Sequence, residues 1–359
     1  MKKYLLILLF INFSFSEEVN YSNQISLLYE KLSLYKQFNN QEDIKIPYNL
    51  NLSINQKNKN VLLIKRKLFL SGEYVYSKDD YNDIYDENTI IALSRFQANN
   101  QIKETGILDK ETVDKLNKPI KKIINDLNKN IIRLKNINFD STSVIINIPE
   151  YKLSFFYNGN LIYSMNVIVG SYNNQSCLLN SKIDSLIINP SWYVPNSIAQ
   201  NEMIRKLNNN PDYFVKNGFN IYSDGKLIEP ENYDAIENTD NLKFVQKPQE
   251  KNALGKIKFV FKNNCGIYLH DTNQRELFVK SKNKSLSHGC IRLSKPFDLA
   301  NILLRINNIN PSIINTYLES NKTKKIDLNN PIPIYIIYQN IIINKENEIV
   351  YLNDIYRKN

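Results

Sequence analysis

The spacing of hydrophobic residues changes near residue 143 and divides the chain into a helical first part and a strand-rich second part. Before this point apolar residues recur every three or four positions, which is the period of an amphipathic helix; beyond it they mostly alternate, as in a strand. One amphipathic helix is predicted within residues 17–60, with Ile25, Leu28, Tyr29 and Leu32 at helical spacing. Another is predicted over 119–134. The pattern as a whole predicts an α+β protein.

A compact helical unit is predicted over residues 61–117. Its first helix, residues 61–70, ends at Ser71-Gly72, where glycine can adopt the conformation that closes a helix. Asp86 and Asp109 each precede a helical run, and their carboxylates can cap the free N–H groups of its first turn. The inward face of the second helix is expected to carry Ile90, Leu93, Phe96 and Gln97.

The second part begins with an alternating pattern that predicts strands at 143–148, 152–157 and 161–169. Asn158-Gly159 separates the last two and is typical of a tight hairpin turn. Later runs predict strands at 256–261, 266–269, 334–338 and 341–343, and a helix that starts at Lys295-Pro296-Phe297.

Residues 196–250 interrupt the strand pattern with an irregular stretch that is rich in asparagine. A helix is expected at its start, capped by Ser197 together with Gln200. Ala199, Met203, Ile204 and Leu207 are expected to face inward. Just before it lies the only tryptophan, Trp192, for which a core position is the simpler interpretation.

The N-terminus has the features of a secretion signal. Lys2 and Lys3 precede an apolar run, and Ser14-Phe15-Ser16 resembles a cleavage site, so residues 1–16 are predicted to be removed on export. The apolar run is shorter than the roughly 20 residues needed to span a bilayer. Retention as an uncleaved anchor stays open.

Composition adds little to this picture. The net charge is +10, and removal of two lysines with the signal lowers it to +8. Such an excess suits an anionic partner such as a wall polymer, but no basic run is long, and a compositional bias of the proteome explains the excess as well. No nucleic-acid motif is present.

The candidate chemistry is concentrated within residues 268–293. Both histidines of the chain, His270 and His288, lie there with Cys290, one of three cysteines. Thiolate is the nucleophilic form of cysteine, and a neighbouring imidazole is its usual activator. A lone cysteine or histidine would be read as a structural residue, but this clustering favours catalysis. His270 follows the predicted strand and is the candidate base, whereas His288 is expected to shape the pocket.

The remaining cysteines, Cys177 and Cys265, are interpreted as two buried free thiols, although they are the only pair that could join if Cys290 stays free. Two histidines and one reactive thiol fall short of a zinc set, so no metal and no cofactor are expected.

His270, sixteen intervening residues and Ser287-His288-Gly289-Cys290-Ile291-Arg292 resemble the signature of the L,D-transpeptidases, the family with the YkuD-type catalytic domain. The resemblance implies that Cys290 is the nucleophile, that His270 is the base and that the main-chain carbonyl of Asp271 supports the base. It further implies backbone donors near Gly289 for the oxyanion. Tyr268, Ser287, His288, Arg292 and Trp192 are candidates for substrate contacts.

Two other stretches extend the resemblance. Thr89, Ala92, Leu93, Phe96, Gln97, Gly106 and Thr112 match the small three-helix peptidoglycan-binding domain, although each also has a plain core or capping role. Residues 351–356 resemble the end of the long, lid-bearing L,D-transpeptidases of Gram-negative envelopes. One departure concerns Ser176-Cys177, which stands where the family usually carries Thr-Pro.

The expected organisation follows from these patterns and likenesses. It comprises a mostly β catalytic domain with an inserted lid at about 196–250 and a small three-helix peptidoglycan-binding-like domain. The expected boundaries are 1–16 for the signal, 17–60 for a helix and linker, 61–117 for the helical domain, 118–142 for a bridging helix packed against the catalytic unit, 143–325 for the catalytic domain and 326–359 for C-terminal strands.

The implied activity is cross-linking of peptidoglycan stem peptides by an exported, wall-associated enzyme of the periplasm. Other cell-wall enzymes are candidate partners. Two alternatives stay open: an L,D-carboxypeptidase that uses water as acceptor, and a non-catalytic wall-binding protein. An unrelated cysteine protease or amidase is disfavoured because such enzymes usually place the cysteine before the histidine. The sequence does not decide the oligomeric state.

Overall fold

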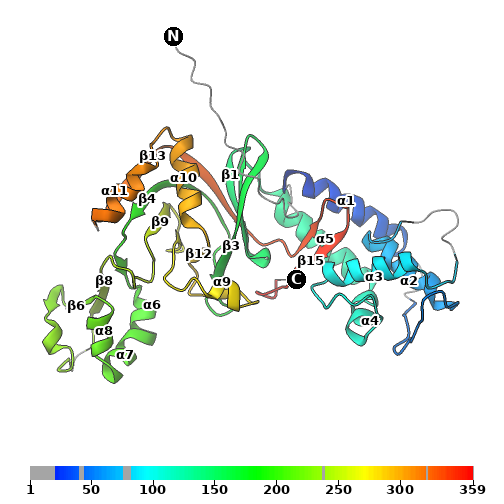
Figure 1. The fold of residues 1–359 in the computed structure, drawn as a ribbon, viewed down its shortest axis with the longest axis horizontal. Helices are drawn as coiled ribbons and strands as arrows, with labels where there is room; N and C mark the ends of the chain where they lie inside the picture. The colour runs from blue at the N-terminus through cyan, green and yellow to red at the C-terminus, as the bar shows by residue number, and fades with distance from the viewer. Residues whose placement is uncertain (1–20, 40–43, 76–81, 237–238, 321, 359) are drawn as a thin grey trace, which may run out of the picture. The chain divides into compact units, whose positions relative to one another are not determined.

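The computed structural model describes residues 21–39, 44–75, 82–236, 239–320 and 322–358 (Figure 1). The expected signal at residues 1–16 lies outside them. The chain divides into two compact units. The first holds the described residues up to 138 together with 340–353, and the second holds 139–339 and 354–358. No helix of the described residues is both long enough and apolar enough to cross a membrane.

The first unit is helical and is completed by a short hairpin from the C-terminal part of the chain. Helix α1 packs against α5, and both contact the hairpin strand β14. We expected α5 to bridge toward the catalytic unit; its main partner is α1, within the first unit. The elements are α1 (Tyr21–Gln37), α2 (Asn60–Ser71), α3 (Glu87–Asn99), α4 (Lys110–Leu116), α5 (Ile120–Lys135), β14 (Ile341–Ile343) and β15 (Ile349–Tyr351).

The expected caps of α2, α3 and α4 are present. Asp86 and Asp109 each accept a hydrogen bond of 2.8 Å from the backbone N–H three residues on. Gly72 ends α2 with φ +109°, a conformation that glycine adopts at little cost. Gln97 is fully buried, and its amide hydrogen-bonds the loop that leads to α4. These contacts fix the three helices around one apolar cluster.

Helix α1 buries a different face from the one expected. Leu28 and Leu32 are buried, but Tyr29 is 45% exposed. Tyr21 and Tyr35 lie on the buried side instead. The prediction failed because tyrosine has an apolar ring and a polar hydroxyl and occurs both in cores and at solvent-exposed surfaces. Helical spacing alone therefore does not tell which side of the helix carries a buried tyrosine.

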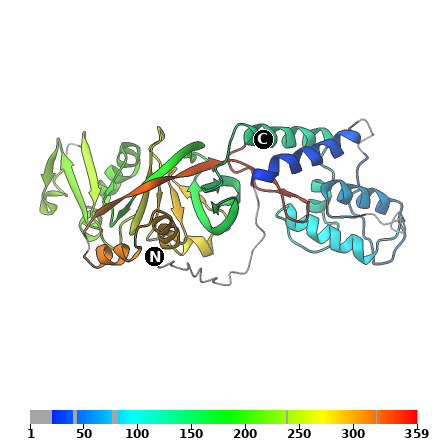
Figure 2. The same cartoon turned by 90° about the horizontal axis from the view of Figure 1, so that it is seen from above.

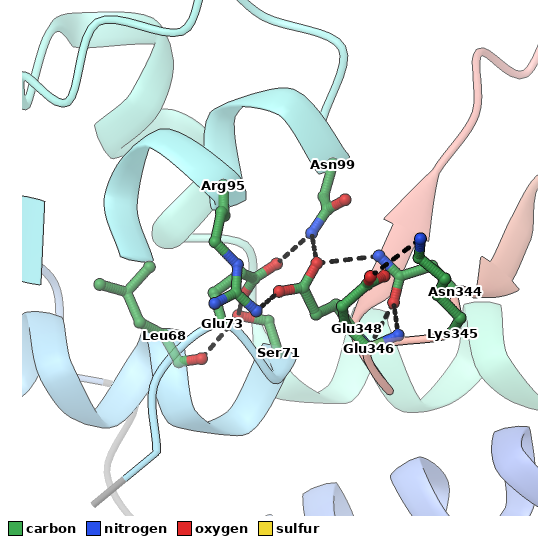
Figure 3. Close-up of polar contacts among 9 residues, drawn as sticks. All are labelled: Leu68, Ser71, Glu73, Arg95, Asn99, Asn344, Lys345, Glu346 and Glu348. Atoms are coloured by element: carbon green, nitrogen blue, oxygen red, sulfur yellow. Dashed lines mark hydrogen bonds and ion pairs between the residues drawn. The ribbon is translucent and has the colours of Figure 1, made fainter. Parts of the chain in front are cut away.

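A buried polar cluster joins the hairpin to α3 within the first unit (Figure 3). The carboxylate of Glu348, which lies just before β15, forms an ion pair with Arg95 and accepts hydrogen bonds of 2.8 Å from Asn99 and Asn344. Asn99 also donates to Glu73 at 3.0 Å. Burial raises the pKa of the Glu73 carboxyl. The C-terminal hairpin is therefore part of the core of the first unit.

The second unit is built on one nine-stranded sheet. The strand order is β11-β3-β12-β10-β9-β4-β13-β1-β2, and an additional pairing of β2 with β3 closes it. Helices α10 and α11 contact the sheet at β13 and β4. The strands are β1 (Ser143–Asn147), β2 (Lys152–Tyr157), β3 (Asn160–Gly170), β4 (Leu179–Ile188), β9 (Ile257–Phe261), β10 (Leu269–His270), β11 (Ser285–Ser287), β12 (Ile291–Leu293) and β13 (Lys324–Ile337), with helices α9 (Leu277–Lys280), α10 (Pro296–Ile306) and α11 (Ser312–Ser320).

Strand β13 is much longer than the predicted 334–338 and runs far along the sheet (Figure 2). Proline weakens a strand prediction because it cannot donate to a ladder, and Pro331 and Pro333 therefore hid this segment. The structure accommodates them because β13 pairs with β1 only from Ile334 onward, so at the prolines only β4 is a partner. A register shift in the pairing with β4 also falls between Asp327 and Ile332.

The insertion is a folded lobe with its own sheet and apolar cluster (Figure 1). Its four strands have the order β5-β8-β6-β7. The predicted Ser197 cap is wrong: α6 begins at Asn196 after Pro195, with no side-chain cap. A π-helical turn at Ala199–Met203 follows. The elements are β5 (Trp192–Tyr193), α6 (Asn196–Ile198), α7 (Ile204–Asn209), α8 (Asp212–Lys216), β6 (Phe219–Ser223), β7 (Lys226–Ile228) and β8 (Leu242–Gln246).

Cys177 and Cys265 form a disulfide, so the prediction of two buried free thiols is wrong. Both residues lie outside the regular strands, and Cys265 is exposed. The sequence gave no indication of the pairing because the two positions are 88 residues apart in the chain and only the folded structure brings them together. Cys290 is the free cysteine of the described chain.

The polar cluster predicts a selective loss of stability. We expect Glu348→Ala to lower the free energy of unfolding of the first unit by about 2 kcal/mol, because Asn99 and Asn344 lose a buried hydrogen-bond acceptor and Arg95, which is partly screened by water, loses its ion pair. Urea unfolding followed by helical circular dichroism should report this shift. Fluorescence of Trp192, which lies in the second unit, should change little.

Glu346→Ala is the matched control, because Glu346 is exposed and its contact with Lys345 spans 3.5 Å. We expect it to change stability by no more than about 0.5 kcal/mol. Equal effects of the two substitutions would contradict a structural role for the cluster.

Candidate active site

Strands β9, β10 and β12 lie side by side and align three basic side chains. Lys258 on β9 is directly opposite His270 on β10, and His270 is directly opposite Arg292 on β12. Side chains directly opposite each other on paired strands point to the same face of a sheet. The neighbouring positions on these strands point to the other face, where Phe259, Leu269 and Ile291 are buried in the core. Strand register therefore places the three basic groups on one face.

His270 is buried and is held in one tautomer by the backbone. Its Nδ1 lies 2.5 Å from the carbonyl oxygen of Asp271. A carbonyl can only accept, so Nδ1 carries the proton and the neutral ring keeps the lone pair of Nε2 free to act as a base. Burial, followed by the positive charge of Arg292, lowers the pKa of His270 to about 3. The imidazole is therefore neutral at physiological pH.

The Asp271 side chain holds the surrounding backbone in place. Its carboxylate accepts a hydrogen bond of 2.9 Å from the backbone N–H of Lys256 and forms an ion pair with Arg275. Gly255 packs against it with φ +62°, and a Cβ there would lie 2.4 Å from the carboxyl group. The carboxylate thus fixes the chain before β9, while the main-chain carbonyl contacts the imidazole.

Cys290 lies half-buried on a loop whose shape is set by two serines. Ser287 accepts a hydrogen bond from the N–H of Gly289 at 3.2 Å and donates one to the carbonyl of Cys290 at 2.5 Å. Ser176 donates to the carbonyl of Gly289 at 2.7 Å. Gly289 has φ +111°, a backbone conformation that residues with a side chain rarely adopt. The loop conformation therefore depends on side-chain hydrogen bonds from both of its sides.

These contacts bear on the oxyanion donors expected from the sequence. The N–H of Gly289 already donates to Ser287, whereas no acceptor for the N–H of Cys290 occurs among the described residues. The Cys290 N–H is thus the better candidate of the two. In the same part of the chain, no hydrogen bond links the Cys290 thiol with His270. Burial raises the pKa of the Cys290 thiol, against the opposing effect of hydrogen bonds from Tyr268.

Tyr268 lies between the thiol and the insertion. Its hydroxyl lies near the Cys290 thiol and the Trp192 indole, and burial raises the pKa of the phenol. Its ring is edge-to-face with His270 at 5.7 Å between centroids. Trp192 is half-buried at the base of the insertion and also packs on Phe219. Trp192 therefore packs against the apolar cluster of the insertion, as the core interpretation expected.

The remaining candidates are placed differently. His288 points to the insertion, where its Nε2 lies 2.5 Å from Glu202 on the π-helical turn. Arg292 donates to the side chain of Gln274 at 2.7 Å. Glu202 and Lys258 belong to no motif in the sequence and were not predicted to lie at the site. Lys258 could have been found from the alternation of strand 256–261, which places it on the face opposite the core.

The comparisons identify the class of protein. The model of the L,D-transpeptidase catalytic domain (YkuD) matches residues 141–324, and one described as "Putative peptidoglycan binding domain" matches residues 57–116. The first match covers more than half of the chain, and the chain belongs to the L,D-transpeptidase catalytic-domain family. The strand-rich second unit and the helical unit before it agree with the α+β organisation expected from the sequence.

Individual relatives differ in how similar they are to this chain. A Haemophilus influenzae protein named "Putative L,D-transpeptidase" is 34% identical over 238 residues, which cover 65% of this chain and 48% of that protein. The chain thus matches about half the length of that relative. An L,D-transpeptidase from Mycobacterium smegmatis is 12% identical, with coverage of 55% of this chain and 58% of that chain and a TM-score of 0.26. One from Xylanimonas cellulosilytica is also 12% identical, with coverage of 81% and 100% and a TM-score of 0.23.

The site predicts how the reactivity of Cys290 depends on pH. Iodoacetamide reacts with thiolate, and burial favours the neutral thiol, so the alkylation rate at Cys290 should rise about tenfold per pH unit from pH 6 until it levels off above pH 8.5. His270→Gln should leave this profile unchanged, because His270 is neutral over the whole range. Rates measured by mass spectrometry of the Cys290 peptide would test this. A plateau already at pH 6 to 7 would instead indicate a thiolate–imidazolium pair.

Proposed function

We propose that the protein is an L,D-transpeptidase that cross-links peptidoglycan through a thioester on Cys290. One observation carries the proposal: the free thiol of Cys290 directly precedes β12, and β12 pairs with β10, the strand that ends at His270, whose tautomer is fixed by the Asp271 carbonyl. This arrangement lies within the family's catalytic domain. It provides a nucleophile, a base and an orienting group, which are the parts that acyl transfer requires.

In the first half-reaction the Cys290 sulfur attacks the carbonyl carbon of the third stem residue. Nε2 of His270 takes the thiol proton as the C–S bond forms, and then gives it to the leaving amine as the amide C–N bond breaks. The terminal D-amino acid leaves and the stem remains as a thioester. Because both pKa shifts favour neutral groups, proton transfer accompanies attack rather than preceding it.

In the second half-reaction an amine of another stem attacks the thioester carbonyl. His270 takes the proton of that amine, the C–S bond breaks, and the proton returns to the sulfur of Cys290. The N–H of Cys290 would stabilise the oxyanion in both steps, with Gly289 allowing the backbone to turn. Tyr268 and Ser287 support the loop, and Trp192, His288 and Arg292 are offered as contacts to the stem.

The insertion supports transfer over hydrolysis. It is a lobe with its own apolar core, and its Glu202 meets His288, two residues from the nucleophile. A lobe in this position would shield the thioester from water and hold an acceptor stem in attack geometry. The competing function is an L,D-carboxypeptidase, in which water replaces the amine.

The setting of the reaction follows from other features. The Cys177–Cys265 disulfide fits an oxidising compartment, in keeping with export by residues 1–16. The helical unit at residues 57–116 would hold the enzyme at the wall, so we place it in the periplasm, in peptidoglycan synthesis and maintenance of cell shape.

Four variants test the assignment of roles. Cys290→Ala should abolish acylation by a carbapenem, whereas a Cys177→Ser, Cys265→Ser double variant should keep the nucleophile and still be acylated. His270→Ala should slow acylation by roughly 10²–10⁴-fold, the usual contribution of a general base. His288→Ala serves as the control and should cost far less. A larger loss in His288→Ala than in His270→Ala would show that the roles are reversed.

Product analysis tests transfer against hydrolysis. Tetrapeptide muropeptides should yield dimers linked between two third-position residues, because the lobe favours an amine acceptor. Mass spectrometry of the products distinguishes these dimers from free tripeptides. If tripeptides dominate the products even at high acceptor concentration, transfer is contradicted and the protein acts as an L,D-carboxypeptidase.

A further inference from the structure

We propose that Lys258 recognises the carboxylate of the D-amino acid that is expelled from the donor stem. The inference rests on the proposed function and adds a specificity-determining residue to it. It starts from the row of basic groups across β9, β10 and β12, in which Lys258 is the member that the sequence motif does not contain.

The side chain of Lys258 is held at the site rather than extended into solvent. It is half-buried, and its Nζ lies 3.7 Å from the centre of the Tyr268 ring. The hydroxyl of the same Tyr268 lies near the Cys290 thiol. A cation stacked on an aromatic ring keeps most of its charge available for an anion on its other side. Burial lowers the pKa of the Lys258 amine, which reflects the cost of keeping a cation there.

No protein carboxylate offsets this charge. Neither Lys258 nor Arg292 forms an ion pair with an acidic side chain in the part of the chain that the structure describes. The nearest acidic residue in sequence to the base, Asp271, directs its carboxylate to Arg275 and to the backbone of Lys256. Two half-buried cations without an acidic partner are costly unless an anion binds between or beside them. The thiolate form of Cys290 is the protein anion that both cations favour. When Cys290 is a neutral thiol or a thioester this anion is gone, and the partner of the cations is then assigned to the substrate.

The position of Lys258 beside the base selects which carboxylate it binds. His270 must protonate the leaving amine, so that nitrogen has to lie within hydrogen-bonding distance of Nε2. The α-carboxylate of the expelled residue is separated from that nitrogen by a single carbon atom. Directly opposite side chains on paired strands have Cβ atoms about 5 Å apart, so the Lys258 amine can reach this carboxylate. Arg292, on the other side of His270, already donates to Gln274.

Binding of the carboxylate would also prepare the base. The positive charges of Arg292 and Lys258 are among the causes that lower the pKa of His270. An anion bound at Lys258 opposes that field, so the imidazole becomes a stronger base when a correct donor is present. Donor recognition and activation of the base are then coupled through one contact.

The test compares two donors that differ only in charge: a tetrapeptide stem ending in a free D-amino acid and the same stem ending in the D-amino amide. Wild-type enzyme should prefer the free acid. Lys258→Met should lower kcat/KM for the free acid by about 10- to 100-fold, the range for a charged hydrogen bond, and leave the amide within about threefold. Release of the terminal residue is measured by mass spectrometry.

Matched variants separate charge recognition from other effects. Lys258→Arg should retain the preference for the acid. Lys262→Met, which removes an exposed lysine beyond the end of β9, should change neither donor. Arg292→Met should lower turnover without removing the preference. Thermal unfolding followed by circular dichroism checks that each variant keeps its fold.

A binding measurement separates this inference from the proposed function. In the Cys290→Ala protein, the free-acid stem should bind more tightly than the amide, and adding Lys258→Met should abolish the difference. If wild type releases no amino acid from either donor, the proposed function fails, yet the binding comparison still decides the role of Lys258. Equal losses for both donors in Lys258→Met, no loss for either, or a preference abolished only by Arg292→Met would each overturn the inference.

Discussion

The register between β9, β10 and β12 is the constraint on which the site depends. A shift of one residue in either pairing would move His270 or Arg292 to the core face and bring a leucine or isoleucine to the site. The register is protected because the other face is fully apolar and packs in the main core. Folding of the nine-stranded sheet and assembly of the site are therefore one event.

Cys290, the proposed nucleophile, lies by contrast on a loop that the sheet does not fix. Its conformation rests on hydrogen bonds from Ser287 and Ser176 and on the positive φ of Gly289. Ser176 belongs to the segment that the Cys177–Cys265 disulfide fastens. The protein thus places the base by strand pairing and the thiol by a network of short polar contacts, which suits a residue that must move slightly during covalent chemistry.

The sequence predicted features that depend on neighbours in the chain. Caps at Asp86 and Asp109, the hairpin turn and the cluster of His270 with Cys290 were predicted because each has a local signal. The alternation of β9 indicates the face on which Lys258 lies. Its position beside His270 was not predicted, because that position follows from which strand pairs with β10 and in which register. The Cys177–Cys265 bond was mispredicted for the same reason. What the sequence could not supply is contact between segments far apart in the chain.

The central claim is that Cys290 becomes acylated by a stem peptide, and direct detection of that adduct tests it most directly. The protein is mixed with a tetrapeptide stem, quenched in acid within one turnover and digested, and the Cys290 peptide is weighed. The account predicts an added mass equal to the stem minus its terminal D-amino acid, lost on treatment with hydroxylamine. Consumption of the stem with Cys290 unmodified at every time point would contradict the account.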